Sequence, residues 1–283
     1  MKFNVYVEKF LSRSNCKFSV FRSLEWRTNS IKIEYADGCK VLIKEFDVIK
    51  PTLIFTLYNI ACFVDNLLNL SVIKTEDYFF PSLRERVENE IKAREILSEL
   101  GVKHPKIHWC KENVICMEYI DGKNILDFYR DGSSEEVYEV SKRIGFEIRR
   151  VHEAGYAFID CRAENYIIGS DGEIYRVDLE FFTKKTRFRS LCDIVTYDVS
   201  ILGLSEDKCM TAIRGFHDGY GKKLSKTELA YISLFSSIYP LSLKEGVDEI
   251  ANRASNTLTL LKESIKNVNL LKLLKSITSM MKE

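Results

Sequence analysis

The sequence predicts an α+β fold in which a small antiparallel sheet with one long helix precedes a larger, mostly helical part. Three observations support this prediction. Residues 17 to 46 alternate between β-branched or aromatic runs and turn residues, as in a three-stranded meander. Residues 81 to 100 carry an apolar stripe at helical spacing. Residues 166 to 177 contain two further short strands around an Asp-Gly turn.

The composition is that of an ordinary globular protein. The chain has 283 residues, of which 46% are hydrophobic and 29% charged, enough for one large domain or two lobes. A formal net charge of +1 gives no strong nucleic-acid signal and no general attraction to anionic lipid. The eight cysteines include no C-x-x-C pair and indicate buried thiols in a reducing compartment. The N-terminus lacks the apolar run of a signal peptide, so we expect a cytoplasmic protein.

The N-terminal meander is predicted strand by strand. The first strand is Phe18 to Trp26, and Arg27-Thr28-Asn29-Ser30 forms the turn after it. Ile31 to Tyr35 alternates cleanly, Asp37-Gly38 turns the chain again, and Cys39 to Phe46 returns. Lys44 lies near the end of the third strand, where a lone lysine usually faces solvent.

An apolar insert, within residues 50 to 80, separates this strand from the next helix. Its segment from Thr52 to Ile73 carries a single charge, Asp65, and is long enough to span a bilayer. Asn, Thr and Ser side chains interrupt it, and no lysine cluster flanks one side. A membrane span and a membrane-surface or partner-binding helix are the alternatives, and we favour a helix packed on the small lobe.

The helix at residues 81 to 100 has clear ends. Pro81-Ser82 marks its start and Gly101 stands at the C′ position. Its Glu90 lies close to the apolar face, next to Ile91, with Glu88 as the nearest alternative for a functional carboxylate.

Polar side chains gather around the hairpin at residues 166 to 177. Closing the hairpin brings Asn165, just before the first strand, beside Asp178, just after the second. Asp160 lies five residues upstream of Asn165 on the same approach loop. Amide and carboxylate oxygens suit Mg²⁺, and a further carboxylate beside a metal can orient a hydroxyl nucleophile. A surface hairpin flanked by solvated carboxylates is the alternative.

This hairpin region resembles the catalytic and metal loops of the protein-kinase-like superfamily, where D-x-x-x-x-N precedes a hairpin and D-F-G. Asp160 and Asn165 match the first motif, and Asp178-Leu179-Glu180 stands at the second with only its Asp retained. Val41-Leu42-Ile43-Lys44 is similar to the V-A-I-K strand.

Two further segments extend the resemblance. The Glu90 helix is similar to that of the small atypical kinases of the KEOPS complex, with the same run of eleven residues from Glu90 to Gly101. Val114 to Gly122 resembles the kinase hinge M-E-Y-[IL]-x-G. The resemblance therefore implies a bilobal kinase-like fold, with residues 1–117 as the small lobe and residues 118–283 as the helical lobe.

The resemblance also implies a role for each site residue. Lys44 holds the phosphates of ATP, and Glu90 orients Lys44. Asn165 and Asp178 bind Mg²⁺, while Asp160 orients or deprotonates the acceptor hydroxyl and Arg162 touches the γ-phosphate. The implied contacts with the rest of the nucleotide come from the hinge and the first turn: Met117, Glu118, Tyr119, Ser30 and Thr28.

The departures from protein kinases bear on substrate and regulation. Phe158-Ile159 replaces H-R, and no G-x-G-x-x-G stands at the first turn. Glu180 replaces the glycine of D-F-G and would stiffen the loop or add a third metal ligand. Only twenty residues separate Asp178 from Asp198, which begins a phrase, residues 198–203, that is similar to the D-V-W-S-L-G helix of the large lobe. This short segment is similar to that of RIO, KEOPS-type and aminoglycoside-phosphotransferase-like kinases, and its basic cluster at residues 184–189 would meet an acidic substrate or solvent.

Three functions are consistent with these patterns. We expect an ATP-dependent kinase that phosphorylates Ser/Thr hydroxyls on a protein. A small-molecule phosphotransferase is the second possibility, supported by the short segment and by residues 216–229, which are similar to helices of that family. A pseudokinase binding module, supported by the missing glycine loop, is the third. A partner or membrane surface would contact residues 52–73.

Overall fold

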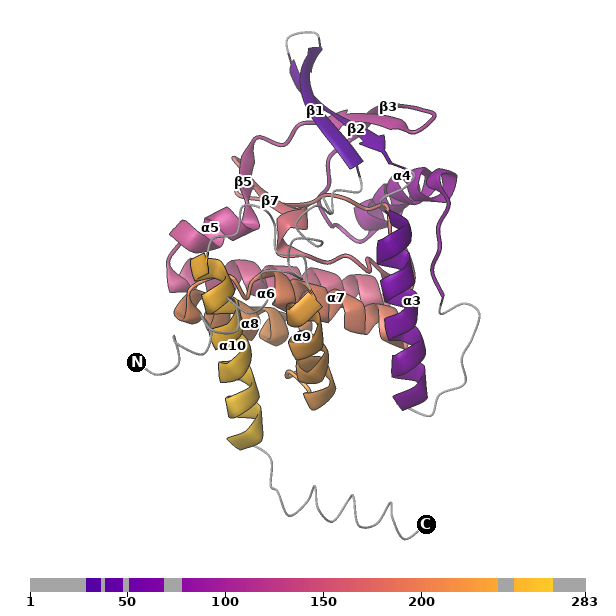
Figure 1. Ribbon diagram of the computed structural model, residues 1–283. Helices are drawn as coiled ribbons and strands as arrows, with labels where there is room; N and C mark the ends of the chain where they lie inside the picture. The colour runs from indigo at the N-terminus through magenta and orange to yellow at the C-terminus, as the bar shows by residue number, and fades with distance from the viewer. Residues whose placement is uncertain (1–28, 37–38, 48–50, 69–77, 239–246, 267–283) are drawn as a thin grey trace.

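The computed structural model describes residues 29–36, 39–47, 51–68, 78–238 and 247–266. Within these ranges the fold is α+β, as predicted: an antiparallel sheet with helix α4 lies above a mostly helical portion (Figure 1). This architecture is compatible with a bilobal kinase-like fold. The elements in chain order are β1 Asn29–Ala36, β2 Cys39–Phe46, α3 Pro51–Leu68, α4 Leu83–Glu99, β3 Ile107–Lys111, β4 Val114–Glu118, β5 Gly122–Asn124, α5 Ile125–Asp131, α6 Ser134–Glu153, β6 Tyr156–Ala157, the 3₁₀ turn η2 Ala163–Asn165, β7 Tyr166–Gly169, β8 Ile174–Arg176, β9 Thr183–Lys184, α7 Arg187–Ser200, α8 Glu206–Tyr220, α9 Lys226–Ile238 and α10 Val247–Lys266.

The N-terminal sheet has four antiparallel strands in the order β1-β2-β4-β3. The predicted strands 31–35 and 39–46 correspond to β1 and β2, whereas the predicted strand 18–26 lies outside the described residues. One expectation was wrong in detail: Asn29 and Ser30 belong to β1 rather than to a turn. They are paired with Phe46 and Glu45, so ladder hydrogen bonding extends the strand.

Helix α4 covers one face of this sheet, as Figure 1 shows. Ser82 caps the helix in a capping box with Glu85, which explains why the helix starts where the sequence predicts. Val87 of α4 packs on Phe46, Ile115 and Met117 of the strands, and these four buried side chains form a small separate core. Burial of this apolar face fixes the rotation of α4, and therefore decides which of its polar residues point inward.

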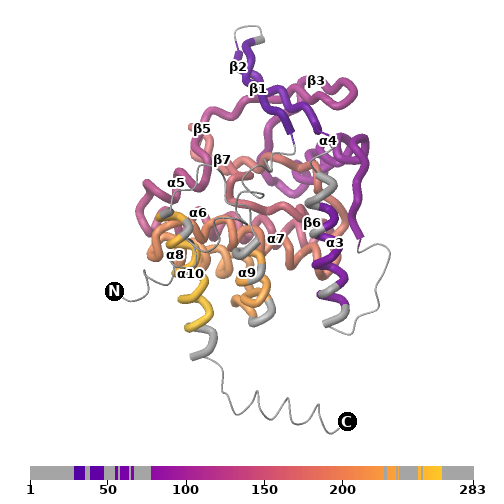
Figure 2. Tube along the Cα trace, viewed as in Figure 1, coloured from indigo at the N-terminus to yellow at the C-terminus, as the bar shows by residue number. Residues whose placement is uncertain are grey.

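Within the described ranges, the insert helix α3 packs on the helical portion and on Phe79, which precedes α4. The favoured expectation of a helix packed on the small lobe is therefore correct only for the contact with Phe79. Tyr58 makes an edge contact with Phe188 of α7 at a centroid distance of 5.2 Å, and Phe55 contacts Phe181 at 5.2 Å. The only charge of this segment, Asp65, is fully buried and accepts a hydrogen bond from Tyr231 of α9 at 2.8 Å. The trace in Figure 2 shows α3 running beside the helical portion. None of the helices in the described part of the chain has the length and apolar character needed to cross a membrane.

The segment Asp178-Leu179-Glu180, at the position of D-F-G, is called the metal loop below. The basic side chains of residues 184–189, which follow it, make contacts within the protein. Arg187 forms an ion pair with Asp65 of α3. Arg189 is buried and donates hydrogen bonds to the carbonyl oxygens of Lys184 at 2.8 Å and Tyr78 at 3.2 Å. Lys185 donates a hydrogen bond to the His152 carbonyl at 2.8 Å, so three of the four basic side chains make internal contacts.

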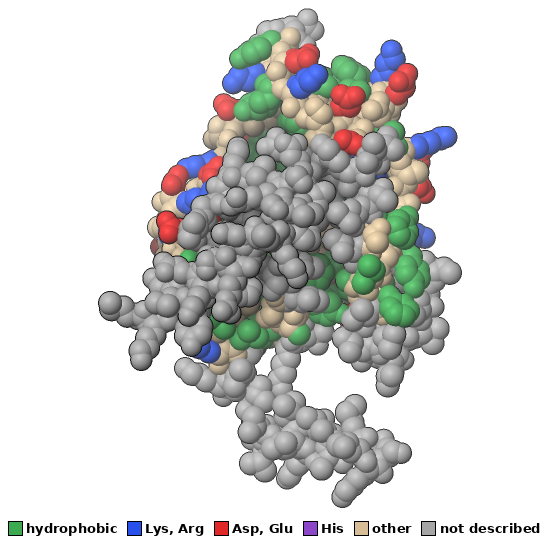
Figure 3. Space-filling model, in the orientation of Figure 1, with side chains coloured by type: hydrophobic (Ala, Val, Ile, Leu, Met, Phe, Trp, Pro, Cys, Tyr) green, Lys and Arg blue, Asp and Glu red, His purple; other side chains and the backbone are tan. Residues whose placement is uncertain are grey.

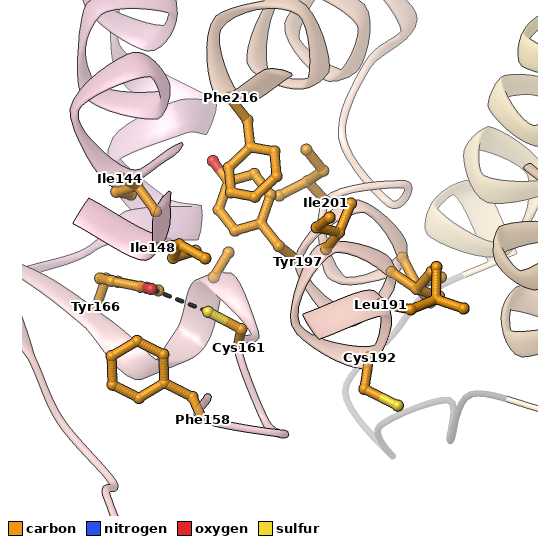
Figure 4. Close-up of a cluster of buried hydrophobic side chains, with 14 of the residues drawn as sticks. Ile144, Ile148, Phe158, Cys161, Tyr166, Leu191, Cys192, Tyr197, Ile201 and Phe216 are labelled. Carbon is orange, nitrogen blue, oxygen red and sulfur yellow. Dashed lines mark hydrogen bonds between the residues drawn. The ribbon is translucent and has the colours of Figure 1, made fainter. Parts of the chain in front are cut away.

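A large core lies beneath the predicted catalytic loop (Figure 4). Phe158, Cys161 and Tyr166 of the loop are buried against helices α6, α7 and α8, and the Cys161 thiol lies 3.1 Å from the Tyr166 hydroxyl. Tyr197 of α7 stacks on Phe216 of α8 with ring centroids 4.1 Å apart. The apolar residues thus anchor the loop backbone, while the side chains of Asp160 and Arg162 between them stay partly exposed, at 20% and 30%.

Helix α7 supports the loop from below. Asp198, the first residue of the phrase similar to D-V-W-S-L-G, lies in the last turn of α7 and pairs with His217 at 2.9 Å. Asp193 instead contacts the loop: its Oδ2 accepts hydrogen bonds from the Phe158 N–H at 2.8 Å and from His152 Nε2 at 2.9 Å. His152 is buried and packs between Asp193 and Tyr220.

Candidate functional site

Lys44 joins three segments that are distant in the sequence. Its ammonium group lies 2.9 Å from Glu90 Oε2 on α4 and 2.6 Å from Asp178 Oδ1, just after β8. The side chain is 4% exposed, and Nζ lies 4.7 Å from the centroid of the Phe46 ring. The lysine therefore faces into the protein and pairs with Glu90, and the alternative of a solvent-facing lysine does not apply.

The electrostatics of this cluster keep all three groups charged. Burial by itself lowers the pKa of Lys44, but the carboxylates of Asp178 and Glu90 outweigh it and raise the pKa above its usual value. Burial raises the pKa of Glu90 and Asp178, and the nearby Lys44 charge reverses the effect and holds both below their usual values. At neutral pH the site is thus one cation between two carboxylates.

Glu90 also binds the metal loop directly. Its Oε2 accepts a hydrogen bond from the backbone N–H of Leu179 at 2.9 Å, and its Oε1 lies 3.0 Å from Arg94 Nη2. The alternative, Glu88, is paired with the exposed Arg84 at 2.8 Å. Glu90 is therefore the α4 carboxylate that faces the site.

The loop at Asp160 is organised by two arginines. Arg162 donates to both carboxylate oxygens of Asp160, at 2.7 and 2.9 Å. Arg176, which is 1% exposed, donates to the backbone oxygens of Asp160 at 2.5 Å and Asn165 at 3.1 Å. Ile159 has a φ of 66°, so the chain makes a sharp left-handed turn immediately before Asp160. A bidentate guanidinium fixes a carboxylate in one plane, and Asp160 is therefore preoriented.

Asn165 and Asp178 are neighbours because the hairpin closes as predicted, with β7 and β8 paired. The N–H of Val177 donates to the Asn165 carbonyl at 2.9 Å. Asn165 Nδ2 donates to the Asp160 backbone oxygen at 3.0 Å, which leaves its Oδ1 without a hydrogen bond among the described residues. Asp178 Oδ1 binds Lys44, and within the same ranges its Oδ2 accepts none. Asp178 has a φ of 60°, a conformation that is uncommon outside glycine and asparagine and is frequent at functional sites.

These two oxygens fit Mg²⁺. One is an amide oxygen and the other a carboxylate oxygen, and Mg²⁺ usually takes one or two protein ligands of this kind and completes its shell with water and phosphate. In the described ranges no group of three or more His, Cys, Asp or Glu side chains is arranged to hold a metal. Mg²⁺ at this position would complete its shell with water and with oxygens of a bound substrate.

The residues predicted to contact the rest of the nucleotide differ in burial and in the face of the sheet on which they lie. Ser30 is exposed and pairs with Glu45, so it lies on the opposite face of the strand from Lys44, which pairs with Ile31. Met117 is buried against α4, where Arg94 Nη2 lies 3.5 Å from its sulfur. The expected nucleotide contacts of these residues remain predictions.

The other two hinge residues lie where the chain leaves the sheet. The Glu118 N–H donates to the Lys106 carbonyl at 2.8 Å, and the Glu118 carboxylate accepts from the Lys106 N–H at 3.1 Å. Tyr119 follows β4 and lies under the Lys40 ammonium at 5.3 Å from its ring centroid.

Sequence reasoning missed Arg86, Arg176 and Asn29. Arg86 lies one helical turn before Glu90, a spacing that places both on one face of α4. Arg176 stands two residues before Asp178, at the end of the short strand β8. These spacings were visible in the sequence, but the partners of the side chains were not.

Comparison with known proteins gives one informative similarity. No family model matches the chain. A stretch of 101 residues, or 34% of the chain, is 32% identical to the KEOPS complex subunit Bud32 of Pyrococcus abyssi. That stretch covers 46% of the archaeal protein, so this chain spans about half the length of the relative it matches. Together with the α+β architecture, the similarity supports a relationship to the kinase-like superfamily.

Proposed function

We propose that this protein is an ATP-dependent phosphotransferase of the kinase-like superfamily, and that its acceptor is a Ser/Thr hydroxyl on a protein. The observation that carries the proposal is the meeting of Lys44, Glu90 and Asp178, which come from a strand, a helix and a loop. Asp160 and Asn165 lie on the adjoining loop and share a hydrogen bond. A purely structural ion pair would not require this additional carboxylate and amide.

Each residue has a distinct task in this proposal. Lys44 neutralises phosphate charge, and Glu90 keeps its ammonium group in place. Asp160 accepts the proton of the acceptor hydroxyl or orients that hydroxyl, and Arg162 holds the Asp160 carboxylate in position. Mg²⁺ held by Asn165 and Asp178 would supply further neutralisation of the phosphate charge. Phosphoryl transfer depends mainly on such positioning and charge neutralisation, so the protein needs few other catalytic groups.

An exposed apolar stripe next to Lys44 supports a nucleotide as the phosphate donor. Ile31 and Ile33 of β1 are 61% and 54% exposed, and they pair across the ladder with Lys44 and Leu42. Directly paired residues lie on the same face of a sheet, so this stripe continues the face that α4 covers elsewhere. A flat base packed there would place its phosphates toward Lys44.

The acceptor class rests on the relative and on the hinge, helix and loop motifs. The segment after Asp178 favours a second candidate, a small-molecule acceptor. Phe181 and Phe182 are buried, and β9 then pairs with β6 before α7 begins at Arg187. Only eight residues lie between Asp178 and Arg187, and this leaves little exposed chain on which a peptide could dock.

Transfer of labelled phosphate tests the proposal. The wild type, the Asp160→Asn variant and the exposed-site control Asp207→Asn are incubated with Mg²⁺ and labelled ATP, alone, with a protein mixture and with a panel of small hydroxyl compounds. Label on protein in the wild type and control, but not in Asp160→Asn, supports the protein kinase. Label only on small molecules favours the second candidate. Nucleotide binding without any phosphate transfer would contradict both enzyme proposals and would support the pseudokinase hypothesis.

A further inference from the structure

Glu180, at the position of the D-F-G glycine, has a fully buried carboxylate with defined partners. Arg86 donates to Glu180 Oε2 from Nε at 2.9 Å and from Nη2 at 2.6 Å. Asn29 Nδ2 donates to the other oxygen, Oε1, at 3.0 Å. Glu180 is 0% exposed and Arg86 is 1% exposed. Because protein donors hold both oxygens, Glu180 is not placed to serve as a third metal ligand.

Arg86 connects four segments of the chain at this point. Its Nη2 also donates to Asn29 Oδ1 at 3.0 Å, and its Nη1 donates to the Asp47 carbonyl at 2.5 Å. The guanidinium carbon lies 5.6 Å from the centroid of the Phe46 ring and 5.9 Å from that of Phe181. The start of β1, the end of β2, helix α4 and the metal loop therefore meet at one guanidinium.

Helix α4 thus holds two consecutive residues of the metal loop. Glu90 accepts the N–H of Leu179, and Arg86, one turn earlier on the same face, binds the side chain of Glu180. Asp178 immediately precedes both and has a left-handed φ of 60°. A single strained residue keeps such a conformation only where its surroundings determine it. The two anchors after Asp178 supply that constraint.

We propose that Arg86, Glu180 and Asn29 are positioning residues. They keep Asp178 in its metal-binding orientation, and no covalent modification of the chain is needed for this. This inference rests on the proposed phosphotransferase function. A buried carboxylate that loses its cation is strongly destabilised, so the loop has a steep energetic preference for the position beside α4. Asn29 extends the constraint to β1, the strand that carries the exposed Ile31 and Ile33 stripe.

The test uses the full chain and variants that separate positioning from folding. Arg86→Ala removes the cation, and Arg86→Lys keeps a charge that can reach one oxygen. The double variant Arg86→Met with Glu180→Leu replaces the buried pair by apolar side chains, an exchange that usually preserves stability. Arg84→Ala is the matched control, because Arg84 lies on the same helix and forms the exposed pair with Glu88. Each variant is measured for amide hydrogen exchange across residues 177–182 without nucleotide, and for the Mg²⁺ concentration that supports ATP binding.

In Arg86→Ala and in the apolar double variant, we expect exchange at residues 177–182 to rise about tenfold or more. The Mg²⁺ requirement should rise about 10- to 100-fold, as for other groups that orient metal ligands. Arg86→Lys should restore part of the protection from exchange and part of the wild-type Mg²⁺ affinity. Arg84→Ala should match the wild type in both measurements. A stable apolar double variant with wild-type exchange and wild-type Mg²⁺ requirement would overturn the inference and reduce the contact to a packing role.

The exchange measurement keeps this inference separate from the proposed function. If the wild type binds no nucleotide, the phosphotransferase proposal fails. The comparison of Arg86→Ala and Arg84→Ala in the nucleotide-free protein then still decides whether Arg86 holds the Asp178 loop.

Discussion

The ammonium group of Lys44 lies 2.6 Å from the carboxylate of Asp178, although 134 residues separate them in the chain. Only the docking of the sheet and α4 on the metal loop brings them together. The Lys44 side chain is 4% exposed and the Asp178 side chain is 25% exposed, so solvent screens their attraction only weakly. Because Glu90 completes the cluster, a change in the charge of any one of the three groups changes the pKa of the other two.

Replacing Lys44 by Met should abolish phosphoryl transfer and lower stability. The variant removes the cation between the buried Glu90 and the partly exposed Asp178. Removal of one partner of a fully buried ion pair typically costs about 3–5 kcal/mol, and we expect less here because Arg94 still pairs with Glu90. Urea unfolding and labelled-phosphate transfer check both effects. Lys32→Met on the neighbouring strand is the control, since Lys32 is exposed and pairs with Ile43 on the other face. An active and fully stable Lys44→Met would contradict the site.

Replacing Asp160 by Asn should separate chemistry from binding. Asp160 contacts Arg162 and the Asn165 amide, and within the described part of the chain it forms no hydrogen bond with Lys44. We therefore expect transfer to fall about 10²- to 10⁴-fold, the usual contribution of a general base, with Mg²⁺-dependent ATP binding retained. Thermal shift with ATP and Mg²⁺, followed by a transfer assay on the same sample, checks this. Equal loss of binding and transfer would mean that Asp160 acts mainly on the loop structure.

Glu147 should make stability fall between about pH 4.5 and pH 7. Burial on α6, only partly offset by Arg143 and Arg150, raises the pKa of Glu147 from 4.5 to about 7. The folded state therefore holds a proton that the unfolded chain releases above its own pKa, so rising pH favours unfolding in this window. Glu147→Gln should remove that slope and stabilise the protein at pH 8 by about 1–3 kcal/mol.

Urea unfolding at pH 5 and pH 8 measures the effect of Glu147→Gln. The control is Glu139→Gln on the same helix, because the Glu139 side chain is 59% exposed and should change little. If the wild type and Glu147→Gln lose or gain the same stability between these two pH values, Glu147 is not the titrating group.

Replacing Asp65 by Ala should loosen α3 from the helical portion. Asp65 accepts the Tyr231 hydroxyl and pairs with Arg187, so the variant leaves a buried hydroxyl without its acceptor, at a typical cost of about 1–3 kcal/mol. Hydrogen exchange should rise in residues 51–68 and stay unchanged in α4. The exposed Ile60→Ala on the same helix is the control. No change in either helix would show that the aromatic contacts alone hold α3.

The surface of α3 that faces away from the helical portion remains open for the predicted partner or membrane-surface contact. Ile60, Phe63 and Phe80 are 55%, 44% and 61% exposed, and a hollow of about 310 Å³ lies among them, lined also by Thr56, Asn59 and Tyr78. Figure 3 shows hydrophobic side chains gathered on the side of the molecule where α3 lies. The contact itself stays a prediction, and the structure shows only that one side of α3 is buried while the other is not.

The sequence by itself determined the local elements and the order of the site residues. Apolar periodicity and the Ser82 cap predicted α4, and the Asp171-Gly172 turn predicted the hairpin that brings Asn165 beside Asp178. These features depend on residues within one or two turns of each other, so short-range spacing is sufficient to reveal them. The choice of Glu90 over Glu88 follows from the same periodicity.

Only the tertiary structure decided which distant groups meet. The face of the strand on which Ser30 lies depends on the register of β1 against β2, and a shift by one residue would reverse it. The packing of α3 on α7 and α9, the use of Arg187 by Asp65, and the burial of Glu180 against Arg86 join residues 94 to 166 positions apart. Periodicity identifies a buried face but not its partner, because that partner is selected by the shape and charge of the assembled core.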